Sequence, residues 1–164
     1  MKKKELNIFI VDENLMASLA LEDYLIKRFG NCIRVSTFKN NESCLQEVDN
    51  NTHVVIVNHS LDQTTGLDTL KSIKEINSNA EVIMLSDKED IALAIASYRL
   101  GAKGTVIKGT GSRKRVSIVV KRILMAPIRI IVKEVGLSER LAMFLTSFVT
   151  VGVVVLFTLF ITKH

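Results

Sequence analysis

The sequence predicts an α/β fold, in which a parallel five-stranded sheet carries helices on both faces, followed by one C-terminal transmembrane helix. Two observations predict the sheet. Five short apolar runs bounded by polar residues lie within residues 6–107, and each is followed by a segment of helical periodicity. A third observation, a long uncharged run near the C-terminus, predicts the membrane helix.

Each element is predicted from its own pattern of apolar residues and end signals. The expected strands are 6–11, 33–38, 53–57, 81–85 and 104–107. The expected helices are 14–29, 41–48, 66–76, 88–100 and 113–124. Gly30 is placed to end the first helix and Asn41 to cap the second. Pro127 is expected to break or kink the last of these helices.

Polar residues follow four of the expected strands. Because ligands of doubly wound sheets bind outside the carboxyl ends of the strands, these residues are the candidate site. They are Asp12 and Glu13, Asn58 and His59, Ser86 and Asp87, and Lys108.

The C-terminal segment 141–162 contains 22 residues and no charged side chain. As a helix it would span roughly 33 Å, enough to cross the hydrocarbon core of a bilayer, which is about 30 Å thick. No signal peptide is evident at the start of the sequence, so we expect a single-pass, tail-anchored membrane protein.

Charge predicts the orientation of this anchor. Residues 113–140 carry eight basic and two acidic side chains, a net charge of +6. Because basic residues beside a membrane helix favour the cytoplasmic side, the N-terminal domain is expected in the cytoplasm. The positive charge is expected to contact anionic lipid head groups and does not indicate nucleic-acid binding. The expected organisation is a domain over 1–124, a basic amphipathic linker over 125–140 and the membrane helix over 141–162.

Two features leave alternatives open. The linker is predicted to lie at the membrane interface, and the alternative is a helical connector that pairs with a second copy. Ala142, Thr146 and Thr150 form a small-residue stripe that is compatible with a homodimer. Cys32 and Cys44 are too few for a disulfide scaffold or a cysteine-rich zinc site, and we expect both to be buried, reduced thiols.

Four motifs in residues 5–124 resemble those of response-regulator receiver domains, the CheY-like phosphoacceptor modules of two-component signalling. They are IFIVDEN (8–14), HVVIVNHSLDQTTGLDTLKSI (53–73), EVIMLS (81–86) and YRLGAKGTVIKG (98–109). The resemblance implies a flavodoxin-like sheet of strand order 2-1-3-4-5. It also implies that Asp12 and Glu13 match the metal-binding acidic pair, Ser86 the switch hydroxyl, Lys108 the phosphoryl-pairing lysine and Gly66 the loop glycine.

The resemblance fails at the phosphoacceptor position, where Asn58 replaces an aspartate. A carboxamide is a poor nucleophile and cannot form an acyl phosphate. It also removes one negative charge, so that magnesium binding at Asp12 and Glu13 should be weak at best. Thr105 replaces the aromatic switch residue, while Gly109 and Asp62 stand at the two positions where the family usually has proline.

We therefore expect a degenerate, non-enzymatic pseudo-receiver that requires no cofactor and binds a histidine kinase, another receiver or a membrane complex. Its interaction surface is expected to include residues 91–100 and 113–124. The alternative is an active response regulator with an atypical acceptor, for which His59, Asp62 and Asp87 are the candidates. A third reading is a flavodoxin-like domain that binds a small ligand, but no aromatic residue near the strand ends supports it.

Overall fold

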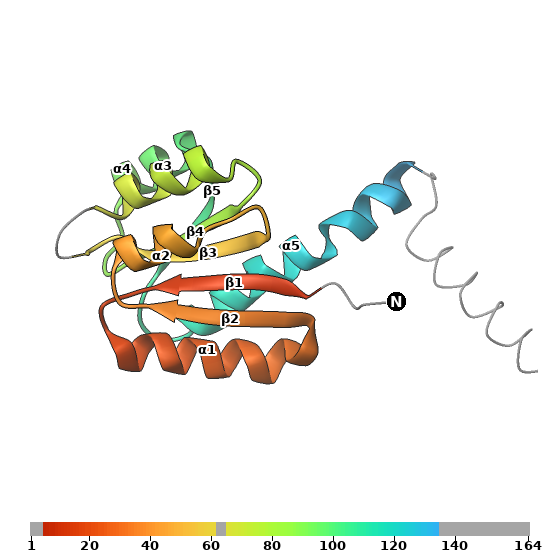
Figure 1. Ribbon diagram of the computed structural model, residues 1–164, viewed down its shortest axis with the longest axis horizontal. Coiled ribbons are helices and arrows are strands. Elements are labelled where there is room, and N and C mark those ends of the chain that lie inside the picture. Colours follow the sequence, from red (N-terminus) through yellow and green to blue (C-terminus); the bar gives the residue numbers. More distant parts are fainter. Residues whose placement is uncertain (1–4, 62–64, 135–164) are drawn as a thin grey trace, which may run out of the picture. The chain divides into compact units, whose positions relative to one another are not determined.

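The strands of the sheet form where the chain has short, nearly continuous apolar runs. The computed structural model describes residues 5–61 and 65–134. Its strands are β1 (Leu6–Val11), β2 (Ile33–Phe38), β3 (Thr52–Asn58), β4 (Glu81–Ser86) and β5 (Ala102–Ile107). All pairings are parallel, and the order β2-β1-β3-β4-β5 confirms the predicted sheet (Figure 1).

Helices follow each strand. They are α1 (Leu15–Phe29), α2 (Asn41–Glu47), α3 (Gly66–Ile76), α4 (Ile91–Arg99) and α5 (Ser112–Glu134), with a short 3₁₀ helix, η1 (Gly30–Cys32), after α1. In Figure 1, α2, α3 and α4 lie together on one side of the sheet, and packing of α2 on α3 and of α3 on α4 agrees with this. Residues of α1 and of the start of α5 line a common pocket on the other side.

The core consists of the central strands and the helix faces that cover them. In β3 and β4, the runs Val54–Val57 and Val82–Leu85 are at most 5% exposed, because helices cover both faces of a parallel sheet. Leu70 and Ile73 of α3 are fully buried against this core. Burial of these apolar side chains is the main driving force that holds the strand ends, and hence the candidate site, together.

Local capping differs from the prediction at two helices. The N-cap of α2 is Asn40, whose side chain accepts a hydrogen bond from the Ser43 amide, so the assignment to Asn41 was wrong by one residue. The predicted helix 88–100 begins only at Ile91, because Asp90 adopts extended backbone geometry and caps it through the Leu93 amide.

Pro127 was expected to break or kink the last helix, and the break does not occur. Helix α5 continues from Ser112 through Pro127 to Glu134. A proline removes one backbone donor, but the hydrogen bonds of the turns on either side still stabilise a long helix. The contacts divide the chain into one unit over Met1–Ile123 and a second over Leu124–His164. The domain boundaries expected from the sequence stay predictions.

The predicted membrane segment 141–162 lies outside the described residues. Within residues 5–61 and 65–134, no helix is both long enough and apolar enough to cross a bilayer. The anchor is therefore an expectation from the sequence alone.

The two cysteines differ in their surroundings. Cys44 is fully buried in α2, and burial raises the pKa of its thiol to about 12. Cys32 ends η1 and is half-buried, so the expectation of burial is confirmed only for Cys44. The reason is that Cys32 precedes β2 and does not enter the sheet.

Helix α3, which follows the candidate site, starts with a capping box. Thr65 Oγ1 accepts a hydrogen bond from the Asp68 amide at 3.2 Å, and the Asp68 carboxylate accepts one from the Thr65 amide at 3.3 Å. We expect Thr65→Ala to lower the free energy of unfolding by about 1 kcal/mol, because the Asp68 amide in the first turn of the helix loses its acceptor. Urea denaturation followed by circular dichroism measures this loss. The control Thr110→Ala, at an exposed threonine outside the helices, should be neutral; equal losses in both variants would contradict the capping role.

Candidate functional site

The candidate site residues converge because their strands are parallel neighbours. Asp12 directly follows β1, Asn58 ends β3, Ser86 ends β4 and Lys108 directly follows β5. Asp12, Asn58 and Ser86 are each at most 5% exposed, although all three are polar. Buried polar groups need hydrogen-bond or charge partners, so their contacts define what this site can do.

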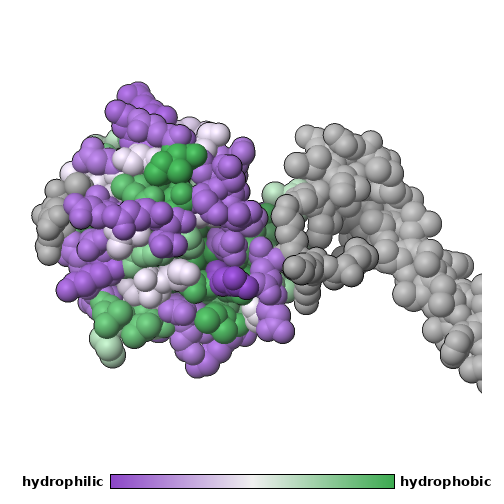
Figure 2. All heavy atoms as spheres, viewed as in Figure 1, coloured by the Kyte–Doolittle hydropathy of each residue, from purple (hydrophilic) through white to green (hydrophobic). Residues whose placement is uncertain are grey.

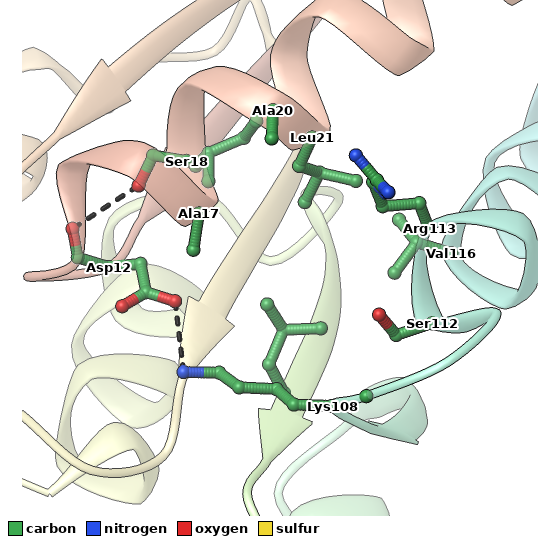
Figure 3. Close-up of a pocket in the computed structure, with 12 residues that line it drawn as sticks. Asp12, Ala17, Ser18, Ala20, Leu21, Lys108, Ser112, Arg113 and Val116 are labelled. Carbon is green, nitrogen blue, oxygen red and sulfur yellow. Dashed lines mark hydrogen bonds and ion pairs between the residues drawn. The ribbon is translucent and has the colours of Figure 1, made fainter.

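Asp12 is the centre of these contacts. Its Oδ2 forms an ion pair with Lys108 Nζ at 3.0 Å (Figure 3). Its Oδ1 accepts hydrogen bonds from the Asn14 amide at 3.1 Å and from Asn58 Nδ2 at 3.3 Å. Ser18 Oγ also donates to the Asp12 carbonyl at 3.3 Å, which ties α1 to the end of β1. Asp12 is therefore a buried carboxylate with partners at both oxygens.

Lys108 has a second carboxylate partner that sequence reasoning missed. Its Nζ lies 3.4 Å from Asp87 Oδ1, and the Asp87 side chain is 58% exposed. The sequence placed Asp87 only at a strand end and among the alternative acceptors. The signal that could have found the pair is the adjacency of β4 and β5, which brings the residue after β4 close to the residue after β5.

Asn58 is the last residue of β3, and its side-chain amide contacts the end of β1 and the loop that follows β3. Its Nδ2 donates to the Ser60 carbonyl at 2.8 Å as well as to Asp12. Its Oδ1 is buried, and no donor among the described residues reaches it. A buried acceptor without a donor costs about 1–3 kcal/mol. The two bonds of the amide nitrogen offset this cost in part.

Ser86 and Thr105 stand at the positions of the family's switch residues. Ser86 Oγ donates to the Lys88 carbonyl at 2.7 Å, within its own loop. Thr105 is a half-buried residue of β5. Glu13 follows Asp12 and is also half-buried. The Ser86 hydroxyl is thus bonded to its own loop and not to Asp12, Asn58 or Lys108.

The alternative acceptors are in different surroundings. Asp62 lies outside the described residues. His59 is half-buried, and its Nδ1 is buried without a hydrogen-bond partner in the described part of the chain. Asp87 is more exposed than His59, but its carboxylate forms an ion pair with Lys108.

A pocket of about 210 Å³ opens beside Asp12 and Lys108, and it was not predicted from the sequence. Small residues of α1 and Gly109 leave this space between α1 and the start of α5 (Figure 3). Its lining is mostly apolar, with Asp12, Lys108 and Arg113 as the charged members. The complete lining is Ile10, Asp12, Ala17, Ser18, Ala20, Leu21, Leu85, Lys108, Gly109, Ser112, Arg113 and Val116.

The donor set does not fit a divalent cation in this arrangement. Hard cations such as Mg²⁺ prefer several anionic or carbonyl oxygens. Here the amide nitrogen of Asn58 and the ammonium of Lys108 face the two oxygens of Asp12. Among residues 5–61 and 65–134, no cluster of three or more His, Cys, Asp or Glu side chains could hold a metal ion. The weak binding expected at Asp12 and Glu13 stays a prediction.

Fold and site together define a doubly wound α/β domain with an acid–lysine pair at the carboxyl ends of its strands. The family model of the response regulator receiver domain matches residues 8–120. The chain therefore belongs to the response regulator receiver family of two-component signalling, as its motifs suggested. No curated protein matches the chain.

Solved receiver structures support this assignment. The chain is 25% identical to the BeF3-activated DrrB receiver domain, with a TM-score of 0.65, and the match covers 73% of this chain and 97% of that one. Against the response regulator DrrB of Thermotoga maritima, also 25% identical, the TM-score is 0.64 and the match covers 75% of this chain and 54% of that one. A receiver domain protein from Clostridium thermocellum is 22% identical, with a TM-score of 0.65 and coverage of 76% and 98%, and shows the same fold.

Proposed function

We propose that the chain is a pseudo-receiver, a signalling module that binds other proteins without being phosphorylated and is not an enzyme. The observation that carries the proposal is Asn58 at the phosphoacceptor position. Its amide nitrogen is committed to Asp12 and Ser60, and its remaining oxygen belongs to a neutral carboxamide. Phosphoryl transfer in this site needs a carboxylate nucleophile, which the amide does not supply.

The surroundings of Asn58 support a module that does not switch. In the family, the hydroxyl at the Ser86 position approaches the phosphoryl group, but here it donates to Lys88. Lys108, whose counterpart pairs with the phosphoryl group, is already neutralised by Asp12 and Asp87. A population shift needs a ligand that binds one state better than the other. The acceptor of that ligand is missing here.

A role in protein binding is supported by exposed apolar side chains. Helix α4 exposes Ile91 (72%), Ile95 (50%) and Tyr98 (78%), which recur at the spacing of one helix face. Figure 2 shows one side of the described residues, where apolar patches interrupt a mostly hydrophilic surface. Contiguous apolar patches on a domain of this size indicate contact with a partner. A histidine kinase, another receiver or a membrane complex is the expected class.

We further propose that residues 141–162 tether this module to the cytoplasmic face of a membrane. The uncharged run of 22 residues and the +6 charge before it support this tether. Alkaline carbonate extraction of cell membranes tests it. The full chain should stay in the membrane fraction, and a variant without residues 141–162 should be released. Release of the full chain would contradict the tether and leave the pseudo-receiver proposal intact.

Incubation with acetyl phosphate and Mg²⁺, followed by intact-mass measurement, tests the pseudo-receiver proposal. We expect no gain of a phosphoryl group in the wild-type chain. We expect a gain in Asn58→Asp, because this change restores a carboxylate at the phosphoacceptor position beside Asp12. A phosphoryl group on the wild type would instead support the active alternative. Its loss in His59→Gln, Asp62→Asn or Asp87→Asn would then identify the atypical acceptor.

A further inference from the structure

The amide of Asn58 lies between two oxygen atoms that come from different strand ends. Nδ2 is 3.3 Å from Asp12 Oδ1 and 2.8 Å from the Ser60 carbonyl oxygen. A carboxylate and a carbonyl can only accept hydrogen bonds, so the NH₂ group must face them. The opposite rotamer would place three oxygens against one another. The orientation of the amide therefore follows from the chemistry of its neighbours, even though it leaves Oδ1 buried without a donor.

The other oxygen of Asp12 is also occupied. Lys108 Nζ is 3.0 Å from Oδ2, and the Asn14 amide donates to Oδ1 at 3.1 Å. Donors thus approach both carboxylate oxygens, where a cation would need free lone pairs. With Lys108 and the three carboxylates Asp12, Glu13 and Asp87, the formal charge is −2, and an aspartate at position 58 would make it −3. The geometry therefore disfavours a divalent ion, and the charge attracts one less strongly than an aspartate at position 58 would.

We propose that the Asn58 amide, beside the Asp12–Lys108 ion pair, occupies the place of the divalent cation, so that this receiver site is complete without a metal and excludes Mg²⁺. The proposal rests on the assignment of Asn58 to the phosphoacceptor position. The hydrogen bonds and the ion pair join the ends of β1, β3 and β5, which a cation would otherwise help to hold. Entry of Mg²⁺ would require rotation of a buried amide, loss of two hydrogen bonds and dehydration of an ion that keeps its water strongly.

Manganese binding, measured by electron paramagnetic resonance on the full chain in mild detergent, tests the proposal. The probe is Mn²⁺ alone, compared across wild type, Asn58→Ala and Asn58→Asp. We expect no binding to the wild type at millimolar Mn²⁺. Asn58→Asp should bind with a dissociation constant at least about tenfold below the highest Mn²⁺ concentration used, because an added carboxylate joins the site. Asn58→Ala should bind more tightly than the wild type as well, because it removes the NH₂ group without adding charge.

Asn58→Ala distinguishes exclusion of the ion by the NH₂ group from the effect of the missing negative charge. If wild type and Asn58→Ala bind Mn²⁺ equally, the amide does not exclude the ion and the proposal fails. Wild-type binding as tight as that of Asn58→Asp would overturn it too. Neither result bears on phosphorylation, so a chain that binds Mn²⁺ but gains no phosphoryl group would contradict this inference and leave the pseudo-receiver proposal standing.

A second measurement follows the Asn58 amide group of the wild-type chain directly, with Asn58→Asp used only to assign its signals. In a ¹H–¹⁵N correlation spectrum, the Asn58 NH₂ signals are those missing from Asn58→Asp. Because this group is buried and hydrogen bonded, we expect its protons to exchange slowly with solvent. We also expect no paramagnetic broadening of the pair by Mn²⁺. Selective broadening would place the ion beside the amide and refute its exclusion.

Discussion

Lys108→Met is expected to lower the free energy of unfolding by about 3 kcal/mol. The substitution keeps most of the apolar stem of the side chain but leaves the Asp12 carboxylate, which is 4% exposed, without its cationic partner. An uncompensated buried charge usually costs about 3–5 kcal/mol, and the lower end applies because Lys108 is itself 25% exposed. Equilibrium denaturation of the full chain in detergent measures the change.

Lys27→Met is the matched control for this substitution. Lys27 and Asp23 form an ion pair of similar length, 2.8 Å, but their side chains are 75% and 60% exposed. Such a surface pair contributes at most about 0.5 kcal/mol, so the control should be nearly neutral. Adding Asp12→Asn to Lys108→Met should recover part of the loss, because it removes the unpaired charge. Equal effects of Lys108→Met and Lys27→Met would show that the Asp12–Lys108 pair does not stabilise the site.

Gly66→Ala is expected to destabilise the domain by about 2 kcal/mol and to disturb Asn58. An added Cβ would lie 2.7 Å from the Asn58 carbonyl oxygen, 2.7 Å from His59 Cα and 2.8 Å from Met84 Cε. Met84 could move, but the backbone of Asn58 and His59 is held in the sheet, where the His59 amide donates to Leu85 at 2.8 Å. Overpacking of this kind costs about 1–3 kcal/mol. The higher helix propensity of alanine offsets a part of it.

Gly104→Ala provides the comparison for Gly66→Ala. No atom lies within 4 Å of an added Cβ at Gly104, and its backbone conformation suits any residue. We expect this variant to unfold within about 0.5 kcal/mol of the wild type. In spectra of Gly66→Ala, the Asn58 NH₂ signals should shift, since the clash falls on the Asn58 backbone. If Gly66→Ala had the stability of the wild type and unchanged Asn58 signals, the loop after β3 would accommodate the added Cβ without loss of free energy, and the prediction would be wrong.

Much of the candidate site could be predicted from the sequence, because its residues sit at the ends of strands that are themselves easy to recognise. Asp12, Asn58, Ser86 and Lys108 each follow or end an apolar run, and parallel strands bring such positions to one edge. The adjacency of β4 and β5 likewise places Asp87 and Lys108 at this edge. That their side chains form a pair depends on side-chain directions in the loops after the two strands, which no periodicity encodes.

Local hydrogen bonding also explains the errors at helix ends. Asn40 and Asn41 are both good N-caps, and only the extended backbone at Asn40 decides between them. At Pro127, the preference of proline for helix ends was outweighed in a long helix whose other backbone bonds remain. In both cases, the residue's intrinsic preference contributes less free energy than the interactions of the surrounding chain.

The order of apolar runs and helical segments was sufficient to specify the receiver fold, because burial of those runs between two helix layers allows few other arrangements. The amide at position 58 was likewise visible in the amino-acid sequence, together with its chemical consequence. How that amide is oriented was settled only by tertiary packing. The Ser60 carbonyl is two residues from Asn58 in the chain, but Asp12 is 46 residues away, and its Oδ1 meets Nδ2 only after β1 and β3 pair.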